Sequence, residues 1–227
     1  MKKTTLLIMA FILLSSMFAI DNPLWNKAKE MQKKSHNLVP GIQKNTTIIM
    51  NKKREVQRTT EVIVKYEIEG NDFSASVVSA LRNGEPIDED DSEVKSLLTQ
   101  PPDDSEDDST FFDKVTSIEE ISSEISDGKD CICFEYVSDT NDKKGKPKKE
   151  IGKIWIEKET GIPTTREFVV EPLPKKVKKM KITISYNLTD SKELVVSKIE
   201  SNITIKVMLM TFIMSSTQEM SNYFPKL

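Results

Sequence analysis

Residues 180–188 read Met-Lys-Ile-Thr-Ile-Ser-Tyr-Asn-Leu, and this stretch decides the class of fold. Its apolar residues, Ile182, Ile184, Tyr186 and Leu188, alternate with hydroxyl and amide residues. A repeat of two places successive side chains on opposite sides of an extended chain, as in a strand that packs one face on a core. The stretch therefore predicts a half-buried strand of an antiparallel sheet.

Strands with the same alternation precede and follow this stretch. We expect them at 47–50, 55–69, 73–81, 131–137, 151–157 and 165–171, with a long final strand from Leu194 to about Ser215. The dipeptides Asn83-Gly84 and Asp127-Gly128 are strong signals for tight hairpin turns. Because connections this short join antiparallel neighbours, the prediction is one connected sheet of about eight to ten strands.

A helix is expected before the first strand. Asn22 is suited to cap its first turn, and Pro23 is suited to the first helical position. Apolar residues then recur at helical spacing until Pro40-Gly41. The pattern predicts an amphipathic helix over residues 23–38.

Residues 88–109 interrupt the sheet pattern with two acidic runs that flank a short apolar piece. Asp90 and Glu93 could form a capping box for one or two helical turns, and further helical structure is expected up to about residue 121. The acidic runs lack the alternating ligands and the central glycine of a calcium loop. We therefore expect a solvated, mobile insert here.

The first residues have the layout of a secretory signal peptide. A basic start at Met1-Lys2-Lys3 is followed by an apolar run, Leu6–Leu14, and then by small residues that end at Ala19. The run is too short to span a bilayer as a helix. We expect cleavage near Ala19, and export of a single domain formed by residues 20–227.

The composition argues against several classes of function. The chain has 33 Lys and Arg against 36 Asp and Glu, which does not suit a nucleic-acid-binding protein. His36 is the only histidine, and no Gly-x-Ser-x-Gly or Gly-x-Gly motif occurs. A nucleophile with a histidine base, a zinc site and a dinucleotide site are therefore not expected. We predict a protein that is not an enzyme and that needs no metal or cofactor.

Cys131 and Cys133 are two residues apart in an expected strand, so their side chains point to the same face. Their separation along the strand is near the upper limit for a disulfide, and parallel side chains bridge poorly. Two buried, unbridged thiols are the favoured interpretation. Export to an oxidising compartment leaves a disulfide open as the alternative.

The expected final strand carries an apolar patch. One face carries Ile199, Ile203, Ile205, Val207, Leu209 and Ile213. The other face is polar up to Lys206 and then becomes apolar at Met208, Met210, Phe212 and Met214. An apolar end on an otherwise polar face must be covered by something. A packed helix would make it ordinary core, whereas an apolar ligand would make it the wall of a cavity.

Several segments together resemble the outer-membrane lipoprotein-sorting family, the LolA-like periplasmic carriers. The strongest are Gly128-Lys129-Asp130-Cys131-Ile132-Cys133-Phe134-Glu135-Tyr136 and Ile151-Gly152-Lys153-Ile154-Trp155-Ile156-Glu157-Lys158-Glu159-Thr160-Gly161-Ile162-Pro163. Asn83-Gly84-Glu85-Pro86 and Phe111-Phe112-Asp113 also fit, in the same order. The resemblance extends over nearly all of residues 22–227.

This resemblance implies an α+β fold, in which a strongly curved antiparallel sheet forms an unclosed half-barrel with helices over its concave face. It implies a periplasmic carrier that binds lipid acyl chains or lipoprotein anchors between sheet and helices. It favours the cavity interpretation, with a wall formed by Met208, Met210, Phe212, Met214, Phe134, Trp155 and Tyr186. The alternative is a sensor or adaptor of the same fold that binds a membrane-associated protein partner through the acidic insert or through Lys175–Lys179.

Overall fold

The computed structural model describes residues 22–34, 38–69, 72–99, 111–141, 145–208 and 210–225. Three helices are α2 (Pro23–Lys34), α3 (Ser92–Thr99) and α5 (Phe111–Lys114). The main strands are β2 (Ile42–Asn51), β3 (Val56–Glu69), β4 (Asp72–Arg82), β5 (Glu85–Pro86), β6 (Val115–Ser126), β7 (Lys129–Asn141), β8 (Pro147–Glu157), β9 (Pro163–Glu171), β10 (Val177–Leu188), β11 (Leu194–Val207) and β12 (Met210–Ser221). Two short strands, β1 (Leu38–Val39) and β13 (Phe224–Pro225), pair with each other.

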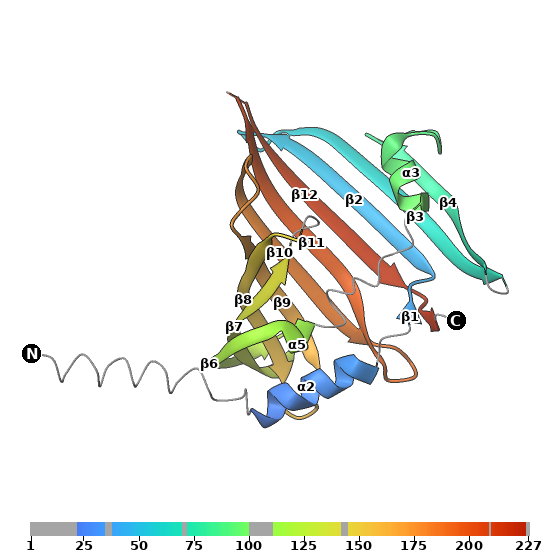
Figure 1. The fold of residues 1–227 in the computed structure, drawn as a ribbon. Helices are drawn as coiled ribbons and strands as arrows, with labels where there is room; N and C mark the ends of the chain where they lie inside the picture. Colours follow the sequence, from blue (N-terminus) through green and yellow to red (C-terminus); the bar gives the residue numbers. More distant parts are fainter. Residues whose placement is uncertain are drawn as a thin grey trace, which may run out of the picture.

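The main strands form one antiparallel sheet of eleven strands, in the order β5-β4-β3-β2-β12-β11-β10-β9-β8-β7-β6 (Figure 1). Among the described residues, the end strands β5 and β6 do not pair with each other, so the sheet is unclosed. The predicted fold class, an unclosed antiparallel half-barrel, is confirmed for the sheet, whereas the predicted helices over its concave face stay a prediction. The sheet has one strand more than the upper end of the predicted range. Three strands were not predicted: β5, the strand at residues 115–126, and a second strand formed by the expected final strand.

Both predicted hairpin turns are present. Asn83 and Gly84 have φ values of 53° and 86°, and Asp127 and Gly128 have values of 50° and 75°. A tight hairpin whose twist matches that of its strands needs a positive φ at both central residues. Asn, Asp and Gly tolerate this conformation best, which is why these two turns could be predicted.

Helix α2 begins as expected but ends earlier than predicted. The Asn22 side chain accepts hydrogen bonds from the backbone N–H groups of Leu24 and Trp25, at 3.0 and 3.1 Å. The helix ends at Lys34, and residues 35–37, which include His36, lie outside the described residues. The prediction of a helix up to residue 38 is wrong, because Leu38–Val39 pairs with β13 as a strand.

The first part of the acidic insert is ordered on the sheet. Residues 92–99 form α3, and its Val94 side chain is 0% exposed. Asp91 caps the helix by accepting the Glu93 backbone N–H at 2.9 Å, so the predicted cap at Asp90 is wrong by one residue. The expectation of a mobile insert is therefore wrong for this part. Residues 100–110, like the expected signal peptide at residues 1–19, lie outside the described residues.

The single long strand predicted from Leu194 to about Ser215 is wrong. The chain reverses after Val207, and Val207 pairs with Met210 across a tight hairpin. Met208 has a φ of 53° in this turn, an unusual conformation for a residue that is not Gly, Asn or Asp. The reversal moves Met210, Phe212 and Met214 to the opposite face from the one that the sequence pattern predicted.

Candidate functional site

One side of the sheet can be followed from strand to strand, because directly paired residues of antiparallel strands point to the same side. A single row crosses nine strands in this way: Phe134, Ile154, Arg166, Ile184, Ile199, Gln218, Asn45, Val62 and Ala80. We call this side the helix-bearing face. The described helices pack at its two ends, with α2 and α5 near β7, β8 and β11, and α3 on β3 and β4 (Figure 1).

Aromatic side chains fix α2 and α5 at one end of this face. Trp25 of α2 is 1% exposed, and its ring centroid lies 5.7 Å from that of Phe134 and 4.8 Å from that of Phe112. The ring centroid of Phe111 in α5 lies 4.8 Å from that of Tyr136. Edge-to-face contacts between buried rings add to the area that they bury. This end of the face is therefore a closed core.

A buried charge lies within that core. The Arg166 guanidinium lies 4.0 Å from the Phe111 ring centroid and 4.9 Å from that of Phe168. Its Nε lies 3.8 Å from Oε1 of Glu150, an atom that also accepts the Tyr136 hydroxyl at 2.5 Å. Burial raises the pKa of Tyr136 well above its usual value, so this hydroxyl stays protonated and keeps donating. Arg166 therefore has contacts that hold it in the floor of the closed core.

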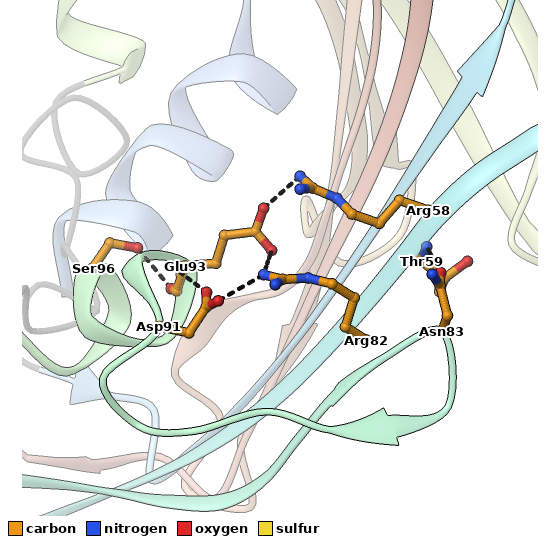
Figure 2. Close-up of polar contacts among 7 residues, drawn as sticks. All are labelled: Arg58, Thr59, Arg82, Asn83, Asp91, Glu93 and Ser96. Atoms are coloured by element: carbon orange, nitrogen blue, oxygen red, sulfur yellow. Dashed lines mark hydrogen bonds and ion pairs between the residues drawn. The ribbon is translucent and has the colours of Figure 1, made fainter.

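Helix α3 is held at the other end of the face by two arginines of the sheet (Figure 2). Arg58 reaches the Glu93 carboxylate at 2.5 Å, and Arg82 reaches Asp91 at 2.9 Å and Glu93 at 3.3 Å. The Glu93 backbone N–H and then the Arg82 guanidinium lower the pKa of the Asp91 carboxyl. The Tyr66 hydroxyl donates to the carbonyl of Leu97 at 3.3 Å. The carboxylates of Asp91 and Glu93 thus face the sheet.

Between the two ends lies a row of apolar side chains that belongs to neither buried cluster. Ile203 pairs with Met214, which pairs with Ile49 on the next strand, and Ile205 pairs with Phe212. All five side chains are half-buried, and neither cluster includes a side chain of β2 or β12. We call these five residues the apolar strip. Farther along the same face the side chains become polar, at Ser201, Ser216, Thr47, Gln218 and Asn45.

The structure separates the predicted site residues. Phe212 and Met214 lie in the apolar strip, whereas Met208 and Met210 lie at the hairpin turn and are 86% and 57% exposed. Phe134 and Tyr186 belong to the closed core with α2 and α5. Trp155 lies on the other side of the sheet, since its neighbour Ile154 is on the helix-bearing face. Seven residues predicted as one wall therefore lie in four places.

Sequence reasoning missed Ile49, Ile203 and Ile205 as members of the same site. A signal for them was present, because apolar residues occupy odd positions up to Val207 and even positions from Met210. A two-residue turn changes the parity of the residues that face one side, so this switch marks the hairpin. The apolar residues at even positions therefore do not form a second apolar face, because Phe212 and Met214 lie on the same face as Ile205 and Ile203.

The two cysteines lie on the opposite side of the sheet. Both are free and buried, which confirms the favoured prediction, and Cys133 pairs with Trp155. Burial raises the pKa of the Cys131 thiol and raises that of Cys133 to about 11. The Trp155 indole N–H donates to the Glu124 carboxylate at 2.6 Å. These thiols are therefore placed as inert packing groups.

In the described part of the chain, no group of three or more His, Cys, Asp or Glu residues could hold a metal ion. None of the described helices has both the length and the apolar character needed to cross a membrane.

No protein-family model matches the chain, and no curated protein matches it. Similar solved structures include a LolA-superfamily protein from Nitrosomonas europaea, at 11% identity and a TM-score of 0.38, covering 90% of this chain and 92% of the other. An outer-membrane lipoprotein-sorting protein domain from Vibrio parahaemolyticus has 13% identity and a TM-score of 0.37, covering 88% and 93%. The lipoprotein LppX from Mycobacterium tuberculosis has 9% identity and a TM-score of 0.33, covering 89% and 96%.

Similarities this loose do not establish a function. The likeness to the first two structures extends over 90% and 88% of the chain, and the resemblance to the lipoprotein-sorting family stays a prediction.

Proposed function

We propose that the protein is an extracytoplasmic carrier that holds a lipid acyl chain, or the acyl anchor of a lipoprotein, against the apolar strip. The observation that supports this most directly is the strip itself. It is apolar and half-buried, and it lies between two helix-covered ends without joining either core. A surface of this kind, continuous across three strands, suits a long flexible apolar ligand.

The dimensions of the strip fit such a ligand. From Ile203 to Ile205 the strip runs about 7 Å along β11, and the three strands together are about 10 Å across. Each methylene of an acyl chain removed from water is worth about 0.8 kcal/mol, so six of them give about 5 kcal/mol before the cost of ordering. Met214 supplies a flexible thioether side chain, which adapts to ligands of different shape.

The polar part of the same face limits where the ligand can lie. Ser216, Gln218 and Asn45 continue the face beyond the strip, toward β1 and β13. Such groups lose hydrogen bonds to water when an acyl chain covers them, so they disfavour it. An acyl chain therefore belongs on the strip, with its polar head toward one end of it.

The adaptor alternative would use the acidic insert as a docking site for a protein. In the described part of that insert, Asp91 and Glu93 are engaged with Arg82 and Arg58. Their charge is already matched inside the molecule. This geometry favours the carrier over an adaptor that docks through Asp91 and Glu93.

Binding of cis-parinaric acid, a fatty acid that fluoresces in apolar sites, tests the proposal. We compare the wild type with Met214→Gln and with Met50→Gln. Both methionines are half-buried on neighbouring strands, but Met50 pairs with Ile213 and therefore lies on the opposite side of the sheet. An amide buried under an acyl chain without a partner costs about 1–3 kcal/mol, which predicts at least a fivefold loss of affinity for Met214→Gln.

The matched control should bind like the wild type, because its change lies outside the strip. Equal affinities for Met214→Gln and Met50→Gln would contradict the proposed site. Absence of binding by the folded wild type, together with no co-purifying lipid in native mass spectrometry, would contradict the proposed function itself.

A further inference from the structure

The β11–β12 hairpin presents apolar side chains to solvent at one end of the sheet. Met208 is 86% exposed and Met210 is 57% exposed, and Val56, at the start of β3, is 58% exposed. Figure 1 shows the hairpin extending beyond the neighbouring turns at this end. Packing against the described residues leaves these three side chains exposed. Apolar side chains exposed together at a projecting turn are unfavourable in water.

Basic residues surround this tip on both sides. The pairing of Phe212 with Asn51 brings the β2–β3 turn to one side of it, and the pairing of Val177 with Ile205 brings the β9–β10 turn to the other. Eight basic residues lie in these two turns, at the start of β10 and at the end of β11. All eight are exposed, and within the described part of the chain none of them makes an ion pair: Lys52, Lys53, Arg54, Lys175, Lys176, Lys178, Lys179 and Lys206.

The charge of this end is opposite to that of the whole chain. The segments that form this end, residues 51–56, 171–179 and 206–210, contain only two acidic residues, Glu55 and Glu171, whereas the chain as a whole has a formal net charge of −3. Basic residues on an acidic protein indicate a surface that faces an anionic partner. A tip that combines exposed apolar side chains with flanking lysines matches a bilayer better than an acidic protein, because a bilayer offers apolar depth below its anionic surface.

We propose that this end docks on an anionic lipid bilayer, with Met208 and Met210 entering the headgroup region and the surrounding lysines contacting the headgroups. The docking surface does not depend on the proposed acyl site, but it adds to it. Val207 and Met210 pair at the base of the turn, next to Ile205 and Phe212 of the apolar strip. Docking in this orientation places the end of the strip at the membrane surface, where an acyl chain would enter or leave.

A tryptophan at the tip reports on docking directly. We compare Met208→Trp with Asp190→Trp in the full chain, using vesicles of phosphatidylglycerol and brominated phosphatidylcholine, whose bromine quenches tryptophan. Asp190 is exposed in the turn between β10 and β11, at the opposite end of β11. Asp190→Trp also removes a negative charge, which favours binding to an anionic vesicle and so reduces the expected difference in quenching. We expect quenching of the tip tryptophan and little change for the control.

The charges are tested separately by sedimentation with the same vesicles. Each lysine near an anionic surface contributes about fivefold to binding, so Lys175→Gln, Lys176→Gln and Lys178→Gln together should weaken binding about a hundredfold. A control variant with Lys33→Gln, Lys34→Gln and Lys192→Gln removes the same charge elsewhere and should bind like the wild type.

Three results would overturn the docking proposal. The first is equal quenching at positions 208 and 190, and the second is equal binding to neutral and anionic vesicles. The third is a wild-type dimer in light scattering that Met208→Ser converts to a monomer, because a second copy would then cover the tip. Binding of cis-parinaric acid by the tip variants separates the two proposals, since docking can fail while the acyl site remains intact.

Discussion

Gly152 is the position where a single methyl group should do most damage to the sheet. A Cβ atom at this position would lie 2.2 Å from the carbonyl oxygen of Glu167 and 2.7 Å from Cβ of Phe168, both on β9. Non-bonded atoms approach to about 3.2–4 Å, so Gly152→Ala requires β9 to move away from β8 by about 1 Å. Those contacts are backbone and Cβ atoms, which cannot move aside as a flexible side chain can.

The cost can be worked out from this displacement. Overpacking of a tight site costs about 1–3 kcal/mol, and stretching one or two strand hydrogen bonds adds about 1 kcal/mol each. The smaller entropy of the unfolded alanine chain returns about 0.4–1 kcal/mol. The net loss of unfolding free energy is therefore about 2–4 kcal/mol, which lowers Tm by about 4–16 °C in a chain of this size.

Gly128→Ala is the matched control, because it changes the unfolded chain in the same way. A Cβ atom at Gly128 meets nothing within 4 Å, and only its φ of 75° opposes an alanine, at about 1 kcal/mol. Urea and thermal unfolding of both variants, followed by circular dichroism, measure the difference. A Gly152→Ala protein as stable as Gly128→Ala would refute the close approach of β8 and β9.

Three more predictions concern stability and reactivity. Because burial raises the pKa of Cys133 to about 11, about one such thiol in a thousand is ionised at pH 8. Ellman's reagent should therefore label neither Cys133 nor Cys131 within minutes in the native protein, but should label both in unreduced denaturant. Fewer than two labelled thiols in denaturant would indicate a disulfide. The pKa of the Asp91 carboxyl is lowered in the folded state, so its contribution to folding stability is present above the unfolded pKa of about 3.9 and is lost as the pH falls through the folded pKa. The urea midpoint of the wild type should therefore fall toward that of Asp91→Asn in this acidic range. A difference between the two midpoints that stays constant with pH would contradict the contact with Arg82. Trp25→Ala should cost about 3–5 kcal/mol of unfolding free energy, a fall in Tm of about 6–20 °C, and a smaller loss in thermal unfolding would show that α2 does not anchor the core.

Much of the sheet could be predicted from local pattern. The alternation at residues 182–188 places Ile184 and Tyr186 in the core, where the structure has them. Asn83-Gly84 and Asp127-Gly128 predict their turns because the backbone there needs a positive φ. The apolar spacing in α2 identifies Ala28, but not Trp25, which is the most buried large side chain of the helix.

What could not be predicted depended on contacts between distant segments. Asp91 and Glu93 look like part of a solvated acidic run, but in the structure they form ion pairs with Arg58 of β3 and Arg82 of β4. Trp155 fits an apolar wall by its chemistry, but its position in β8 turns it to the other side. Side-chain chemistry alone does not show which of two faces a residue occupies.

The hairpin at Met208 connects this difficulty to function. A turn selected only for its conformation would contain Gly, Asn or Asp, as the two predicted turns do. Here a methionine has a φ of 53° and is 86% exposed, so the residue is poorly suited both to the backbone and to water. An apolar environment around the tip would remove the cost of exposing Met208 to water, and a bilayer provides such an environment. An apolar residue at the turn, Met208, is the reason why the turn could not be predicted from the sequence. The same residue supports the proposed role of the turn at a membrane.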